Sequence, residues 1–144
     1  MPLLRLLRLT LLLSLSALGV NSAADDDGTW TYSLSGDEAE IDGCRSTCPT
    51  DLVIPATIDS YRVTGIGFAA FYDSELTSVT IPESVTSIAR YAFAYNQLNN
   101  VTIPDSVTSI GDFAFLQSQL VSVAISDSVT GIESFAFSAE GSDG

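Results

Sequence analysis

Apolar residues recur every 22 positions through the C-terminal part of the chain. The segments that begin at Leu76, Leu98 and Leu120 align with one another without a gap. Such a period predicts a stacked solenoid, because one repeat alone cannot bury its apolar face. Eight columns of the alignment are apolar in every copy, namely Leu76/Leu98/Leu120, Val79/Val101/Val123, Ile81/Ile103/Ile125, Val85/Val107/Val129, Ile88/Ile110/Ile132, Tyr91/Phe113/Phe135, Ala92/Ala114/Ala136 and Phe93/Phe115/Phe137.

Each repeat has an internal pattern that predicts its local structure. Val79 and Ile81 flank Thr80, which is the alternation of a strand with one buried face. Pro82 removes a backbone donor and favours a turn. We expect residues 85–88 to form a second short extended piece and the triplet after residue 90 to close the coil as a helical turn. Stacked coils then pair as parallel ladders at ~4.8 Å, which gives a mainly β solenoid with short helical turns.

The repeat array extends toward the N-terminus through one irregular copy. Leu52–Phe71 fits the same columns when five additional residues are placed between Pro55 and Val63. We therefore expect a leucine-rich solenoid of about four coils over residues 52–137, followed by a flexible tail at 138–144.

Residues 25–51 lie outside the repeat and predict a β-hairpin. Trp30, Tyr32 and Leu34 alternate with polar residues, residues 35–38 suit a turn, and alternation resumes at Ala39. Because a solenoid needs its first coil covered, we interpret this hairpin as an N-terminal cap. An alternative role for Trp30 is a sugar-binding platform, but a lone aromatic stripe beside a repeat array is more often core.

The repeat consensus L-x-x-V-x-I-P-[DE]-S-V-T-S-I-x-x-x-A-F resembles the BspA-like class of leucine-rich repeat. The resemblance covers Leu52–Phe137 and departs at Ser126, where the consensus has proline. It implies a secreted or surface protein, commonly bacterial, that binds other macromolecules, including host matrix proteins in some members. It implies no catalytic residues and no cofactor.

The first 24 residues have the pattern of a secretion signal. Arg5 and Arg8 form a positive region, and Leu9–Val20 is an apolar run. Small residues at positions 22–24 then precede Asp25. A membrane anchor is the competing interpretation, but the apolar run is shorter than the ~20 residues of a span. We predict cleavage before Asp25, no membrane span afterwards, and a secreted, cell-surface or periplasmic location.

Composition excludes several classes of function. The 144 residues include 18 acidic and five basic residues, no His, and a net charge of −13. Nucleic-acid binding is excluded, because a polyanion needs a basic patch that releases its counterions. The absence of His removes Ser-His-Asp and Cys-His catalysis and any His-ligated metal site. Loss of the signal would remove two of the five Arg and leave a charge of −15.

Cys44 and Cys48 are the only cysteines of the chain. An even count in a secreted chain predicts a structural disulfide, here at the junction of cap and solenoid. A metal site would need further soft ligands that the sequence lacks, and a redox centre usually has two residues between its cysteines rather than three.

Two groups of residues are candidate partner contacts. Phe68, Tyr72 and Tyr95 stand in columns where another copy has a polar or small residue, so we expect exposed aromatic side chains there; the residues compared are Arg90, Ala94 and Asp73. The outward positions of the first strand carry neither charge nor aromatic rings. They include Thr80, Asn100 and Thr102, and the last two belong to a glycosylation sequon.

Taken together, the sequence favours a repeat protein that binds an extracellular protein or glycan and acts in adhesion. The first alternative is a structural, self-assembling protein. No apolar cap follows Phe137, so the C-terminal coil is predicted either to self-associate or to belong to a longer repeat array. The third class is a carbohydrate-active enzyme, which needs two carboxylates in a cleft that raises the pKa of one of them. We assign no catalytic, cofactor or metal residues.

Overall fold

The chain is described by a computed structural model, which covers residues 22–24 and 28–139. This part of the chain forms strands and turns and contains no helix. The strands are β1 (Ser22–Ala24), β2 (Trp30–Ser35), β3 (Glu38–Cys44), β4 (Asp51–Val53), β5 (Thr57–Ile58), β6 (Tyr61–Ile66), β7 (Ser78–Thr80), β8 (Ser87–Ile88), β9 (Asn100–Thr102), β10 (Ser109–Ile110), β11 (Ser122–Ala124) and β12 (Gly131–Ile132).

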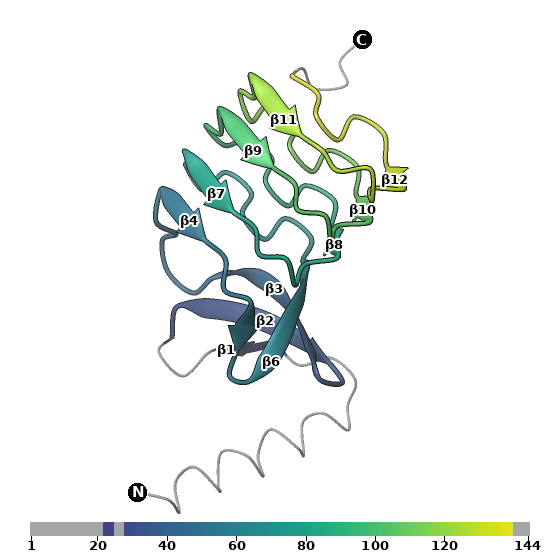
Figure 1. Ribbon diagram of the computed structural model, residues 1–144. Helices are drawn as coiled ribbons and strands as arrows, with labels where there is room; N and C mark the ends of the chain where they lie inside the picture. The colour runs from purple at the N-terminus through teal and green to yellow at the C-terminus, as the bar shows by residue number, and fades with distance from the viewer. Residues whose placement is uncertain (1–21, 25–27, 140–144) are drawn as a thin grey trace, which may run out of the picture.

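The predicted solenoid is confirmed. β4, β7, β9 and β11 follow one another along one side, and β6, β8, β10 and β12 form the next side of about four stacked coils (Figure 1). The strands of these coils pair in parallel, and partners lie 22 residues apart, as Ile66 pairs with Ile88 and Ile110 with Ile132. The pair of β4 and β7 is the exception, because the five additional residues of the first copy separate Leu52 from Val79 by 27 positions. Each 22-residue repeat of the sequence therefore forms one coil of the solenoid.

The interior is made of the apolar columns of the repeat. In the central coils Val85, Ile88, Val107 and Ile110 are at most 1% exposed. Full burial of one such side chain stabilises the fold by ~1.5–3 kcal/mol, so the stack as a whole, rather than any single coil, supplies the core. We call the column Phe71, Phe93, Phe115 and Phe137 the inner ladder; successive rings are stacked 5.2–5.4 Å apart.

A β-hairpin covers the N-terminal end of this stack. β2 and β3 pair antiparallel, and β3 continues the sheet by pairing in parallel with β6. Trp30 packs edge-on against Phe71, the first ring of the inner ladder, with ring centres 6.2 Å apart. Trp30 therefore belongs to the packed interior and not to a sugar-binding platform. Gly43 has φ of 145°, and a Cβ there would lie 2.7 Å from the Ala70 carbonyl oxygen, so the cap approaches the first coil closely at this point.

Two local features differ from the expectation. The five additional residues of the first copy form a second hairpin, β5 and β6, whose turn residues Asp59 and Ser60 have φ of 49° and 75°. The turn that closes each coil is not helical. Tyr91 has φ of 58°, and one left-handed residue interrupts the run of right-handed residues that a helix requires.

The last described coil is only partly covered. Ile125 and Ile132 are 41% and 50% exposed, although their equivalents in the preceding coil are buried. Ser126 replaces proline without loss of the turn, since the Val129 amide donates to the Ser126 carbonyl as Val107 does to Pro104. Ile125 and Ile132 are therefore less buried than their equivalents in coils that are covered on both sides, either by another coil or by the cap.

The predicted signal segment and the predicted flexible tail are not tested by the structure. Of the predicted signal segment, only β1 is described, where it pairs antiparallel with β2. The rest of the signal segment and the tail from residue 140 lie outside the described residues. Among residues 22–24 and 28–139, no helix has the length and hydropathy that crossing a membrane requires.

Candidate binding surface

The left-handed turns after β8, β10 and β12 each direct one aromatic residue outward. Tyr91 has φ of 58°, and Phe113 and Phe135 repeat this conformation with φ of 57° and 58°. The Tyr91 amide donates to the Asp112 carbonyl of the next coil at 3.1 Å, which fixes the turn against its neighbour. This column is one of the eight apolar columns of the repeat, but it does not enter the core, because the left-handed residue rotates Tyr91 outward while the next two residues point inward.

The three outward rings stack on one another along the solenoid. Tyr91 and Phe113 are 5.1 Å apart with an interplanar angle of 9°, and Phe113 and Phe135 are 5.4 Å apart at 5°. Tyr91 and Phe113 are half-buried, whereas Phe135 is 56% exposed. Most ring faces are thus covered by the neighbouring ring, and the edges face solvent.

The first coil continues this row by a different route. The residue of the first coil that is equivalent to Tyr91 is Ala69, which has no ring but keeps the left-handed conformation, with φ of 52°. Phe68 and Tyr72 contact the Tyr91 ring instead, each 6.3 Å from it in an edge-to-face arrangement. Such edge-to-face pairs are favourable for aromatic quadrupoles. The two rings therefore extend the row by one coil.

The structure brings the three predicted aromatic residues together. Tyr95 lies 5.1 Å from Tyr72, which in turn contacts Tyr91. Phe68, Tyr72 and Tyr95 are 68%, 46% and 37% exposed, so their predicted exposure is confirmed, while their role as contacts stays a prediction. We use the name outer aromatic face for the six residues Phe68, Tyr72, Tyr91, Tyr95, Phe113 and Phe135.

One cation accompanies this surface. The guanidinium carbon of Arg90 lies 4.9 Å from the centre of the Tyr91 ring and 5.7 Å from that of Phe113. Since the two rings are parallel and 5.1 Å apart, the guanidinium contacts both of them. A cation–π contact at an exposed site contributes ~0.5–1 kcal/mol. The outer aromatic face therefore already holds one arginine side chain of this chain.

The other predicted contact residues lie elsewhere on the coil. Thr80 ends β7, and Asn100 and Thr102 begin and end β9; all three are exposed. The Ser122 hydroxyl donates to the Asn100 side-chain oxygen at 2.7 Å. A turn and a second strand separate these positions from the aromatic turn in every coil, so they form a separate polar surface.

The disulfide expected at the cap is present. Cys44 and Cys48 are bonded, and their Cα atoms are 5.4 Å apart. Cys44 is the last residue of β3, so the bond closes a small loop where the cap strand leaves the sheet. No group of three or more metal-ligating side chains occurs among the residues that the structure describes.

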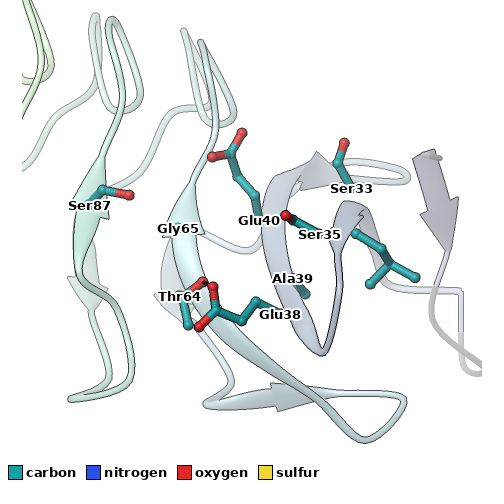
Figure 2. Close-up of a pocket in the computed structure, with 9 residues that line it drawn as sticks. Ser33, Ser35, Glu38, Ala39, Glu40, Thr64, Gly65 and Ser87 are labelled. Atoms are coloured by element: carbon teal, nitrogen blue, oxygen red, sulfur yellow. Dashed lines mark hydrogen bonds between the residues drawn. The ribbon is translucent and has the colours of Figure 1, made fainter. Parts of the chain in front are cut away.

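A shallow depression at the junction of cap and solenoid contains two carboxylates. Its volume is about 260 Å³, and Glu38, Glu40, Ser33, Ser35, Thr64 and Ser87 are among its lining residues. Burial, and then the nearby Asp42 carboxylate, raise the pKa of Glu40. Figure 2 shows the two carboxylates on different sides of Gly65, with Glu38 beside Thr64, whose hydroxyl donates to it at 3.4 Å. The carboxylates diverge rather than face a common point, which does not favour the paired chemistry of glycoside hydrolysis.

One buried polar residue was missed by the sequence reasoning. Asn96 is 2% exposed, and its amide nitrogen donates to the carbonyls of Phe71 at 2.8 Å and Phe93 at 2.9 Å. Its side-chain oxygen accepts from the amides of Ser74 and Leu76. The signal was available in the sequence, because the column Ser74/Asn96/Ser118 is polar in every copy although apolar columns follow two residues later.

These features define the chain as a repeat solenoid with one aromatic surface. The family model described as BspA type Leucine rich repeat region matches residues 54–142 in six copies. The chain belongs to this family. No curated protein matches the sequence.

Solved structures of bacterial leucine-rich repeat proteins resemble the chain. The T. pallidum leucine-rich repeat protein is 23% identical over 81% of this chain and 67% of its own length, with a TM-score of 0.63. A leucine-rich repeat protein from Bacteroides capillosus is 27% identical over 74% of this chain and 98% of its own length, with a TM-score of 0.52. A leucine rich cell surface protein from Faecalibacterium prausnitzii is 27% identical, but the chain covers only 46% of it and the TM-score is 0.44.

Proposed function

We propose that the protein is a secreted or cell-surface repeat scaffold that binds an extracellular protein through the outer aromatic face and acts in adhesion. The observation that carries this proposal is the continuous row of aromatic side chains from four successive coils. Exposed apolar patches of this kind mark interaction sites, and Tyr and Phe are enriched in protein interfaces.

The geometry of the rings favours a protein partner over a glycan. A sugar ring packs on the face of an aromatic ring, and the faces within the row are covered by neighbours 5.1–5.4 Å away. Ring edges and tyrosine hydroxyls remain for contact. They suit a partner surface that offers aromatic faces and hydrogen-bonding groups.

Two further observations support an extracellular location. The first 24 residues have the order of regions found in a secretion signal. The Cys44–Cys48 disulfide is stable in an oxidising compartment and rare in the cytosol. We accordingly propose that the protein acts outside the cytoplasm and not as an enzyme.

The test is a binding screen with immobilised extracellular matrix proteins and glycans, measured by surface plasmon resonance. We expect a protein ligand whose affinity falls at least ~10-fold in the double variant Phe68→Ser and Tyr95→Ser, because interface aromatics commonly contribute 1 kcal/mol or more each. The matched control is the double variant Asn100→Ala and Thr102→Ala on the separate polar surface, which should bind within ~2-fold of the parent. Loss of binding in the control alone, or binding to glycans alone, would contradict the proposal.

A second candidate function is self-assembly through the C-terminal coil. Val121, Ile125 and Ile132 are 85%, 41% and 50% exposed there, and such a surface favours association with another apolar surface. Sedimentation velocity over a range of protein concentrations tests this candidate. A concentration-dependent increase in mass that disappears in Ile132→Thr supports it, and a monomer at every concentration rules it out.

A further inference from the structure

The outer aromatic face contains a second ring pair that repeats the first one coil later. Tyr91 and Phe113 form the first pair, and Phe113 and Phe135 form the second, with centre distances of 5.1 and 5.4 Å and interplanar angles of 9° and 5°. The two pairs are therefore nearly identical in geometry. The two pairs differ in the charged residue that precedes the first ring of each pair in the sequence.

Arg90 shows what such a ring pair accommodates. Its guanidinium carbon lies 4.9 Å and 5.7 Å from the two ring centres of the first pair. At the second pair the position 22 residues after Arg90 is Asp112, so an acidic residue takes the place in the repeat that the preceding coil gives to arginine. Glu133, exposed and two residues before Phe135, adds a second acidic residue in the following coil.

The coils around the second ring pair are also negatively charged. Residues 63–139 contain seven acidic residues and a single basic residue, Arg90. The electrostatic potential over this part of the solenoid therefore attracts cations and repels anions. Phe135, at 56% exposed, is also more open to solvent than Tyr91 and Phe113. The second ring pair thus combines an accessible ring with two acidic residues close to it in the chain.

We propose that the site formed by Asp112, Phe113, Glu133 and Phe135 binds an arginine side chain of the partner polypeptide. The guanidinium would contact the Phe113 and Phe135 rings as that of Arg90 contacts the first pair, and Asp112 would accept its hydrogen bonds. Arginine suits the site better than lysine, because a planar guanidinium both packs on rings and pairs with a carboxylate. The inference rests on the proposed function, since it names the chemistry of the partner at the same surface.

The first experiment uses two synthetic peptides of 15 residues and the full chain. One peptide contains four arginines in a Gly/Ser background, and the other has glutamine at those four positions. In isothermal titration at low ionic strength we expect the arginine peptide to bind at least ~10-fold more tightly, a factor consistent with one cation–π contact and one ion pair. Equal affinity of the two peptides overturns the inference.

The second experiment separates the site from the net charge of the protein. Asp112→Arg places a guanidinium in the position that Arg90 occupies one coil earlier, so the variant should fold and fill its own site. Asp105→Arg makes the same change of charge on an exposed turn of the same coil, after β9. We expect Asp112→Arg to lower the affinity for the arginine peptide ~10-fold and Asp105→Arg to lower it no more than ~3-fold.

Circular dichroism and the unfolding midpoint establish that both variants are folded before the affinities are compared. Equal losses of affinity in the two variants mean that net charge alone attracts the peptide, and they overturn the site. Phe135→Ser gives an independent readout if Asp112→Arg fails to fold, since an exposed ring can be removed without a cavity; unchanged affinity in this variant also overturns the site. If a matrix protein binds the parent and is lost in the Phe68→Ser and Tyr95→Ser variant but not in Asp112→Arg, the proposed function stands and the arginine site fails.

Discussion

The inner ladder and the outer aromatic face are built from the same material in the same period, yet they have opposite environments. Phe71, Phe93 and Phe115 are at most 1% exposed, whereas Phe68 and Phe135 are 68% and 56% exposed. The inner ladder and the outward column Tyr91, Phe113 and Phe135 both stack at 5.1–5.4 Å along the solenoid. The difference teaches that a repeat period aligns side chains into columns, while the backbone of the turn decides which columns are buried.

The largest expected effect compares one ring from each set. Phe93→Ala should lower the free energy of unfolding by ~3–5 kcal/mol, because it removes a fully buried ring and leaves a cavity. Phe113→Ala in the outer aromatic face should lower it by only ~1–3 kcal/mol, the scale of the two aromatic pairs that Phe113 forms with Tyr91 and Phe135. Urea denaturation of both variants measures the two values. Similar losses would show that the outer rings contribute to the core as much as the inner ones.

The next prediction concerns the polar residue that supports the inner ladder. Asn96→Ala leaves the carbonyls of Phe71 and Phe93 without a buried donor, so we expect a loss of ~1–3 kcal/mol in unfolding free energy. Gln97→Ala, at the exposed neighbouring position, is the matched control and should stay within ~0.5 kcal/mol of the parent. If both variants unfold at the same urea concentration, the hydrogen bonds of Asn96 do not stabilise the inner ladder.

A smaller effect is expected for the cation on the outer aromatic face. Arg90→Gln removes the contact with Tyr91 and Phe113 and should cost ~0.5–1 kcal/mol. Arg62→Gln, an exposed arginine in β6, changes the charge equally and serves as the control. Thermal unfolding of both variants compares them, and a larger loss in Arg62→Gln would contradict a stabilising role for the ring contact.

The smallest effect lies outside both sets of rings, in the depression at the cap. Because burial raises the pKa of Glu40, the folded protein binds its proton more tightly than the unfolded chain does. The stability contribution of Glu40 therefore falls as the pH rises from its ordinary pKa of 4.5 through its raised value. Glu40→Gln should flatten the pH dependence of the unfolding midpoint in this window and stabilise the protein slightly at neutral pH. An unchanged pH profile would show that Glu40 is not the group responsible.

Much of the fold could be predicted from the sequence because its columns are local and repeated. The 22-residue register appears directly in the pairing of Ile66 with Ile88 and of Ile110 with Ile132. The hairpin of the cap and the Cys44–Cys48 bond followed from alternation and from cysteine count. The hairpin of β5 and β6 could not be predicted in this way, because an alignment shows that five residues are added but not how their strands pair.

The candidate site was predicted in part. Phe68, Tyr72 and Tyr95 were recognised because the repeat has a polar or small residue at an equivalent position, namely Arg90, Ala94 and Asp73. Tyr91, Phe113 and Phe135 were recognised only as an apolar column, since an aromatic column in a repeat has the same hydrophobicity whether it is buried or exposed. The contact of Tyr72 with both Tyr91 and Tyr95 crosses from one coil to the next, and a linear pattern does not contain it.

The sequence by itself determined the period, the family, the stacking register and the acidic charge of the coils. Only the tertiary structure decided that one aromatic column faces solvent and joins three further rings into a surface. The physical reason is the left-handed conformation at Tyr91, Phe113 and Phe135, with φ of 57–58°. One such residue reverses the side of the chain on which a ring lies, and hydrophobicity along the sequence does not report φ.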